Sequence, residues 1–385
     1  MKYRRFGRLD WKVSALGFGA MRLPVIDGDS SKIDEAEAIK MIRYAIDHGV
    51  NYVDTAYPYH RGNSEILVGK ALQDGYRERV KLATKMPTWM VKSQDDMDKY
   101  LDEQLKKLQT DHVDFYLLHG LQKERWSKLQ ELDVLAWAEK ALADGRIKHL
   151  GFSFHDTYDV FKEIIDAYDG WTFCQIQYNY LDKDYQAGTK GLKYAASKGL
   201  AVVIMEPIEG GMLALVPPPE IQSVWDEAKV KRTPAEWALQ WVWNQPEVSV
   251  VLSGMSTMEQ VVENVESASR SDPGTLTKEE LQLISRVSKK YREFGFIGCT
   301  ACGYCQPCPE GVAIPEIFSF SNEHSKKRGD RDAQQEVVKR YAEAIPAENG
   351  AKRCAKCGKC EDLCPQHLPI RRLIGRAGWV FERDR

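Results

Sequence analysis

The chain lacks a long apolar run, an apolar leader and any imbalance of charge. No segment approaches the roughly 20 apolar residues of a membrane-spanning helix, and the first residues, MKYRRFGRLDW, contain no apolar signal-peptide core. We therefore expect a cytoplasmic protein without a membrane span. The formal net charge is only −2 over 385 residues, which argues against a nucleic-acid partner.

Cysteine is nearly absent from the first 290 residues and concentrated in the last quarter of the chain. Cys174 stands alone in an apolar stretch, where a cysteine is usually an inert core residue. The other eight form two runs, Cys299-x2-Cys302-x2-Cys305-x2-Cys308-Pro309 and Cys354-x2-Cys357-x2-Cys360-x3-Cys364-Pro365.

These two cysteine runs suit iron-sulfur clusters better than disulfides or zinc. Disulfides need an oxidising compartment, and zinc usually takes paired half-sites separated by a spacer. Thiolates at every third position, closed by Cys-Pro, match the two 4Fe-4S centres of bacterial ferredoxins. By analogy, one cluster takes Cys299, Cys302, Cys305 and the distant Cys364, and the other takes Cys354, Cys357, Cys360 and Cys308.

The 45 residues between the runs show helical rather than alternating apolar spacing. Residues 291–385 therefore resemble the small helical ferredoxin modules that are fused to many oxidoreductases. This region holds 16 Lys and Arg against 13 Asp and Glu. The excess offsets the charge of the clusters or steers an acidic electron-transfer partner.

Residues 1–290 alternate short apolar runs with amphipathic stretches, eight times over. The runs are residues 14–18, 52–55, 80–85, 113–118, 147–153, 175–178, 200–205 and 248–253. Parallel strands alternating with helices predict an α/β fold, a (β/α)8 TIM barrel followed by the small helical domain. A doubly wound sheet is disfavoured because no G-x-G-x-x-G fingerprint follows any run.

Polar residues stand at the ends of three adjacent predicted strands. They are Asp54, Tyr59, Lys85 and His119. The carboxyl ends of barrel strands share one rim, where active sites lie. We expect Lys85, paired with Asp54, to favour ionisation of the Tyr59 phenol, and His119 to polarise a carbonyl oxygen. Each residue alone also fits a cap, a packed ring or a snorkelling cation, but their convergence favours an acid-base site with Tyr59 as proton donor.

These residues carry a resemblance to a known family. Its motifs are Asp54-Thr-Ala-x-x-Tyr59 with Ser64-Glu65, Thr84-Lys85, and Val113-Asp114-x4-His119. They resemble the signature blocks of the aldo/keto reductases, and with the cysteine runs the chain resembles the ferredoxin-fused branch of that family. The resemblance implies hydride transfer between a nicotinamide cofactor and an aldehyde or ketone, with the same four polar residues as the catalytic tetrad.

The resemblance also implies a set of cofactor contacts. They are Gly19, Met21, Ser153, Gln177, Met205, Glu206, Pro207, Ser253, Gly254, Met255, Gln260, Glu263 and Asn264. Phe154 replaces an expected Asn, and Met205 stands where many members have a stacking Tyr. Gly254 and Gln260 stand where NADPH-selective members have Lys and Arg. NADP(H) is expected by family weight, with NAD(H) as the alternative.

Substrate identity is scarcely encoded, beyond a small carbonyl compound or alcohol. Trp89, Tyr57 and His60 follow the catalytic strands and either shape an aromatic mouth or pack ordinary loops.

Coupling between the two halves leaves three hypotheses. Nicotinamides move hydride and clusters move single electrons, and a flavin normally mediates between them, although no flavin fingerprint is visible and none is excluded. In the first hypothesis the barrel is a carbonyl reductase or alcohol oxidase, and the clusters connect it to an external one-electron donor or acceptor protein through a cryptic flavin or a partner. In the second, the protein transfers electrons and its barrel binds a ligand without carbonyl reduction. In the third, the clusters only stabilise the small domain.

Overall fold

The computed structural model describes residues 1–383, in two compact units. Unit 1 comprises Met1–Pro207 and Ala238–Leu276, and unit 2 comprises Ile208–Trp237 and Thr277–Arg385. The boundary predicted after residue 290 lies inside helix α11 (Lys278–Phe294).

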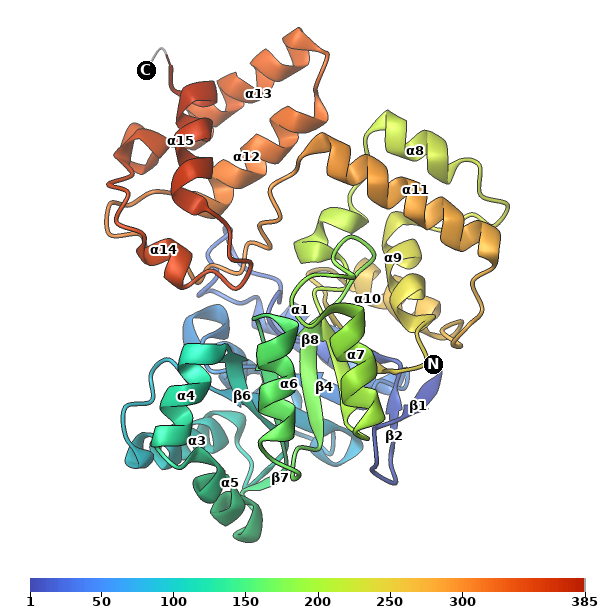
Figure 1. The fold of residues 1–385 in the computed structure, drawn as a ribbon, viewed down its shortest axis with the longest axis vertical. Helices are drawn as coiled ribbons and strands as arrows, with labels where there is room; N and C mark the ends of the chain where they lie inside the picture. The colour runs from blue at the N-terminus through green and yellow to red at the C-terminus, as the bar shows by residue number, and fades with distance from the viewer. Residues whose placement is uncertain (384–385) are drawn as a thin grey trace. The chain divides into compact units, whose positions relative to one another are not determined.

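Eight parallel strands close into a barrel in unit 1, with helices around it (Figure 1). The strands are β3 (Leu16–Gly19), β4 (Tyr52–Asp54), β5 (Lys81–Met86), β6 (Val113–Leu121), β7 (Ile147–Phe154), β8 (Phe173–Gln177), β9 (Ala201–Met205) and β10 (Val248–Gly254). They neighbour one another in chain order, and β10 pairs with β3 to complete the circle. This confirms the predicted (β/α)8 barrel.

The helices of the barrel form because apolar residues recur at helical spacing, and in α1, α3 and α10 a polar cap begins the helix. In α1 the side chain of Asp34 accepts from the N–H of Glu37, and Met41, Ile42 and Ala45 are buried. The helices are α1 (Glu35–Asp47), α2 (Ser64–Ala71), α3 (Gln94–Leu108), α4 (Lys123–Glu131), α5 (Val134–Ala143), α6 (Tyr158–Asp166), α7 (Gly188–Ser197) and α10 (Met258–Ala268), while α9 (Pro234–Trp243) crosses the border between the units. Short 3-10 turns are η1 (Tyr59–Gly62) and η2 (Arg77–Arg79).

A hairpin of β1 (Tyr3–Arg5) and β2 (Lys12–Ser14) precedes the barrel, and the alternation of apolar runs does not indicate it. Phe6, fully buried, packs against Phe115 with ring centroids 4.7 Å apart and against Phe173 at 5.7 Å. These rings belong to one apolar cluster with residues of the barrel strands. The hairpin therefore fills the amino-terminal end of the barrel.

Side chains inside the barrel change from apolar to polar along β4 and β5. Alternate residues of a strand face the same side, so Asp54 shares a side with Tyr52, and Lys85 with Ala83. Tyr52 and Ala83 belong to the apolar cluster at the amino-terminal end. The polar residues follow two positions later and come at the carboxyl end, where the β4–β5 register sets Asp54 opposite Ala83. Strand geometry thus gathers the predicted site at one rim.

Unit 2 is helical, with a small core of its own. Phe318, Tyr341 and Phe381 are buried in it, from three helices that contact one another (Figure 1). The helices are α8 (Pro219–Trp225), α11, α12 (Ile314–Lys326), α13 (Arg331–Ala344), α14 (Lys359–Asp362) and α15 (Ile370–Phe381), with 3-10 turns η3 (Glu209–Ala214), η4 (Ala347–Asn349) and η5 (Ala351–Arg353). This confirms the predicted helical tail. Within residues 1–383, no helix has both the length and the apolar character that crossing a membrane requires.

Candidate active site and cluster sites

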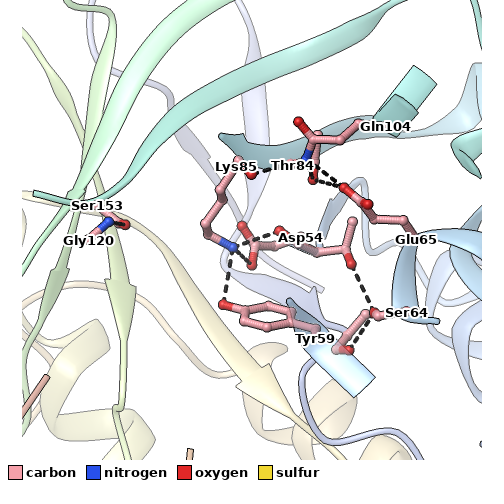
Figure 2. A network of polar contacts seen from close by, with 11 residues as sticks. Asp54, Tyr59, Ser64, Glu65, Thr84, Lys85, Gln104, Gly120 and Ser153 are labelled. Carbon is pink, nitrogen blue, oxygen red and sulfur yellow. Dashed lines mark hydrogen bonds and ion pairs between the residues drawn. The ribbon is translucent and has the colours of Figure 1, made fainter. Parts of the chain in front are cut away.

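The ammonium of Lys85 lies at the centre of the polar group on the rim (Figure 2). Its Nζ donates to Oδ1 of Asp54 at 2.6 Å, to the carbonyl of Thr55 at 2.7 Å and to the hydroxyl of Tyr59 at 3.3 Å. His119 lies next to Tyr59, edge to face, with ring centroids 6.0 Å apart. The four residues predicted from three strand ends are therefore neighbours in one place.

Burial sets the electrostatics of the Lys85–Asp54 pair. Both side chains are at most 3% exposed. Burial raises the pKa of Asp54, against the opposing effect of Lys85. It lowers the pKa of Lys85, against the opposing effects of Asp54 and then Glu65. Oδ2 of Asp54 is buried and has no hydrogen-bond partner among the described residues, so the carboxylate depends on Lys85 for compensation.

A second buried carboxylate, Glu65, lies behind Lys85. Its Oε1 accepts from Thr84 Oγ1 at 2.7 Å and from Gln104 Nε2 at 2.6 Å, and Gln104 also donates to the carbonyl of Lys85 at 3.0 Å (Figure 2). Tyr116 donates its hydroxyl to Gln104 Oε1 at 2.7 Å. This network fixes the backbone of β5 at the residue that carries the ammonium.

Burial favours the neutral form of His119. Burial, followed by the charge of Lys85 and then by His155 and Arg125, holds the pKa of His119 well below 6.5. The indole of Trp89 lies beside the imidazole, with centroids 5.1 Å apart, and the guanidinium of Arg125 lies 5.4 Å from the Trp89 ring centroid. A neutral imidazole at this position can donate one hydrogen bond without carrying charge.

Hydrogen-bonding side chains at the ends of β7 and β8 occupy the positions that the resemblance assigns to the nicotinamide. Ser153 is buried and its Oγ accepts from the N–H of Gly120 at 2.7 Å. Gln177 is buried and donates to Oδ2 of Asp182 at 2.8 Å. Two residues before it on the strand, Gln175 has a buried Oε1 without a hydrogen-bond partner among the described residues. These donors and acceptors fit a carboxamide.

The region from the end of β10 into α10 carries a second set of the expected cofactor contacts. Asn264 donates to Ser253 Oγ at 3.1 Å, and Gln260 Oε1 accepts from the N–H of Ser256 at 2.8 Å. Thr257 caps α10 by accepting from the N–H of Gln260. The amide and hydroxyl groups thus order the loop that leads to the start of α10, where backbone N–H groups suit a phosphate.

Arg22 brings a cation to this end of the barrel, which sequence reasoning missed. Its side chain runs 3.1 Å from where a Cβ on Gly254 would lie, and its guanidinium lies 4.0 Å from the carboxylate of Glu206. Glu206 in turn accepts at its carbonyl from Asn179. Gly254 carries no cation of its own, and its missing side chain makes room for Arg22.

Two cavities in unit 2 collect the cysteines in a crossed pattern. One is lined by Cys299, Cys302 and Cys305 of the first run together with Cys364 of the second. The other is lined by all of Cys354, Cys357 and Cys360, with Cys305 and Cys308 of the first run. No three His, Cys, Asp or Glu side chains within residues 1–383 converge on a single metal ion. A cubane cluster places one thiolate on each of four irons, and the crossed donor sets fit this.

Neighbouring sulfurs already influence one another in these cavities. Burial raises the pKa of Cys305 to about 12, with further contributions from Cys302, Cys299 and Cys364. Burial likewise raises the pKa of Cys360, with smaller contributions from Cys354 and Cys308. Thiolate ligation must therefore release protons and offset this cost.

Family models match nearly the whole chain in two parts. The model of the aldo/keto reductase family matches residues 15–289, and that of a 4Fe-4S dicluster domain matches residues 296–368. The chain belongs to the aldo/keto reductase family. It is an oxidoreductase with a C-terminal ferredoxin-like domain.

Relatives in this family match about three quarters of the chain. L-galactose dehydrogenase of Arabidopsis thaliana is 28% identical over 308 residues, covering 74% of this chain and 94% of that protein. The NADH-specific methylglyoxal reductase of Escherichia coli is 26% identical over 339 residues, covering 74% and 100%. The solved holo structure of aldo-keto reductase AKR11C1 from Bacillus halodurans is 29% identical with a TM-score of 0.62, covering 74% and 96%.

Of the three residues considered for the mouth of this aldo/keto reductase, Trp89 lies beside the tetrad. The Tyr57 hydroxyl donates to Glu103 at 2.9 Å, which directs it toward α3. His60 is buried, and its Nε2 accepts from the N–H of Leu23 at 3.1 Å. Tyr57 and His60 therefore serve loop packing, because both have partners away from the tetrad.

Proposed function

We propose that this protein is an NAD(P)-dependent carbonyl reductase in which Tyr59 gives a proton to the oxygen of an aldehyde or ketone. One observation carries the proposal: the buried Lys85 ammonium joins Asp54 and the Tyr59 hydroxyl, at 2.6 and 3.3 Å. A cation that donates to a phenol oxygen stabilises the phenolate left after proton transfer. Asp54 in turn stabilises that cation in a buried place.

The chain's own residues supply proton transfer and orientation. The nicotinamide, when bound, supplies the hydride. Tyr59 holds the proton on its hydroxyl, and neutral His119 donates a hydrogen bond to the substrate oxygen. Ser153 and Gln177 would hold the carboxamide at the ends of β7 and β8. The clusters, held by the crossed cysteine sets, would exchange single electrons with a partner protein.

The choice between NADP(H) and NAD(H) rests on the end of β10. Gly254 and Gln260 offer no charge for a 2′-phosphate, while Arg22 lies across Gly254 and already faces Glu206. One relative is named an NADH-specific reductase. We propose that NADH and NADPH both bind and that NADH, the alternative to the NADP(H) expected from the sequence, is the hydride donor used for carbonyl reduction. An anaerobic titration with each nucleotide, read at nicotinamide and cluster wavelengths, tests this.

Tyr59→Phe tests the reaction itself. Carbonyl reduction should fall by about 10²-fold or more, the usual range for losing a positioned general acid, while the cluster spectrum stays intact. Tyr57→Phe is the matched control, because its hydroxyl contacts Glu103 and its loss should leave the rate nearly unchanged. Equal rates in Tyr59→Phe and the parent would contradict the proposal and favour an electron carrier whose barrel does not reduce carbonyls.

A further inference from the structure

Positive charge in unit 2 is concentrated at its C-terminal end. Residues 351–383 hold eight Lys and Arg, all exposed, against three Asp and Glu. Two of the three carboxylates are engaged: Glu382 is 3% exposed and accepts from the N–H groups of Ala351 and Lys352, and Glu361 pairs with Arg371 at 2.6 Å. Residues 291–350 hold seven Lys and Arg against nine Asp and Glu, so the positive excess surrounds the second cysteine run.

A groove of about 330 Å³ runs along α15 within this positive region. Its lining includes Lys352, Cys354, Lys356, Arg371, Trp379 and Arg383. Gly375 also lines it, and no heavy atom comes within 4 Å of where its Cβ would be. We call this surface the α15 groove. It places exposed cations on both sides of a cysteine of the second run.

The α15 groove also exposes a large aromatic side chain. Trp379 is 68% exposed, and the guanidinium of Arg383 lies 5.7 Å from its ring centroid. Arg376 precedes Trp379 by three residues on α15, so it lies on the same helix face. Trp and Arg are the residues that most often dominate protein–protein binding energy.

The second cysteine run comes to the surface here. Cys357 is the exposed one among the nine cysteines, all of which the structure describes. Its neighbour Cys354 lines the α15 groove. A partner seated in the groove would therefore rest directly on the ligand loop of this cluster.

We propose that the α15 groove is the docking surface of an acidic one-electron carrier protein, which exchanges electrons with the cluster of the second cysteine run. This rests on the electron-transfer part of the proposed function. One electron leaves the partner's reduced centre and enters the oxidised cluster, and no bond or proton is exchanged. Surface charge of this kind accelerates encounter with an oppositely charged partner.

A protein carrier fits the groove better than a nucleic acid or an anionic membrane. All three would be attracted by the cations, but only a redox partner gains from contact with a cluster ligand such as Cys354. Redox encounters also use small interfaces, below about 1,200 Å² in total, which suits one groove and one exposed Trp.

The test is stopped-flow reduction of the holoprotein by a reduced plant-type 2Fe-2S ferredoxin, an acidic one-electron carrier, at increasing ionic strength. The parent rate should fall steeply with salt. Charge reversal in Arg376→Glu with Arg383→Glu should slow reduction about tenfold or more at low salt and remove the salt dependence. Trp379→Ala should slow it at every salt concentration. The control, Arg331→Glu with Lys339→Glu, reverses two exposed charges on α13 and should match the parent.

Two further measurements separate this proposal from the proposed function. Photoreduced deazariboflavin, a small uncharged donor, should reduce the clusters equally in all variants, and NAD(P)H-dependent carbonyl reduction should be unchanged. Equal ferredoxin rates in the parent and in the α15 variants would overturn the docking site while leaving the reductase intact. The docking site is likewise overturned if the variants lose only binding to phosphatidylserine vesicles or duplex DNA. Clusters that accept no electron from deazariboflavin would overturn the electron-transfer role and the docking site together.

Discussion

Lys85 and Asp54 form an ion pair with Nζ 2.6 Å from Oδ1 and with both side chains almost completely buried. A buried ion pair adds little net stability, but removing one partner leaves an uncompensated charge. The proposed chemistry and the stability of the barrel therefore both depend on this ion pair.

Lys85→Met should destabilise the barrel strongly. Loss of the ammonium leaves the Asp54 carboxylate buried without compensation, at a cost of about 3–5 kcal/mol. The double variant Lys85→Met with Asp54→Asn should recover much of this loss. Urea unfolding of the holoprotein measures both. The control is Lys70→Met, which breaks an exposed pair with Glu35 and should cost at most about 1 kcal/mol. Equal losses in Lys85→Met and Lys70→Met would refute a buried charge at Asp54.

Stability of the barrel should decline as the pH falls below about 6.5. The pKa of His119 is lower in the folded protein than its ordinary 6.5, so the unfolded chain binds the proton first. The contribution of His119 to the free energy of unfolding is fully present above pH 6.5. It is lost as the pH falls toward the lower pKa of the folded protein, by up to about 1.4 kcal/mol per pH unit. His119→Asn should reduce this slope in unfolding curves taken from pH 7 to 5, and part of the slope should remain because burial also lowers the pKa values of His60 and His149. A slope unaffected by His119→Asn would contradict burial of a neutral imidazole.

Gly210→Ala should disturb the loop of the first cysteine run. Gly210 has φ 63°, and a Cβ there would lie 2.6 Å from the Cα of Thr300, next to Cys299. Gly211→Ala separates backbone strain from the steric clash. Gly211 also has a positive φ, of 100°, but no heavy atom lies within 4 Å of where its Cβ would be. We expect lower iron content in Gly210→Ala than in Gly211→Ala, measured on protein reconstituted under the same conditions. Equal iron content would show that the contact with Thr300 is unimportant for the cluster loop.

The crossed cysteine sets predict which double variants behave as single ones. Cys299→Ser with Cys364→Ser should lose no more than roughly four irons per chain, because both ligands serve one 4Fe-4S cluster. Cys357→Ser with Cys364→Ser should lose roughly twice as many. Iron analysis with electron paramagnetic resonance of the reduced protein distinguishes the pairs. The opposite pattern would mean that each run holds its own cluster.

Much of this fold and site can be predicted from local sequence. The residues whose roles were not predicted depend on long-range contacts. Eight apolar runs predict the strands because buried parallel strands are apolar on both faces, and Asp54, Lys85 and His119 follow because strand ends meet at one rim. Gln104 has no such signal, since it lies within amphipathic α3 and only its tertiary contact with Glu65 reveals it.

Other misses have the same cause. Arg22 follows β3 as an ordinary loop cation, and only the folded chain shows it over Gly254. By sequence, His60 is as suitable as Trp89 for the mouth of the active site. In the fold, however, its imidazole accepts a hydrogen bond from the N–H of Leu23, which is distant in the chain, and so it packs within a loop. Tertiary contacts between residues distant in the chain decide these roles, and no local sequence pattern indicates such contacts.

The crossing of Cys364 into the cavity of the first run has a consequence for biosynthesis. A ribosome releases the first three cysteines of that set long before the fourth, and the whole of α12 and α13 emerges in between. The fourth ligand of this centre therefore becomes available only after Cys364 has been synthesised. A chain that stops just before Cys364 would therefore leave the centre of the first run open, although all four cysteines of the other centre would already be present.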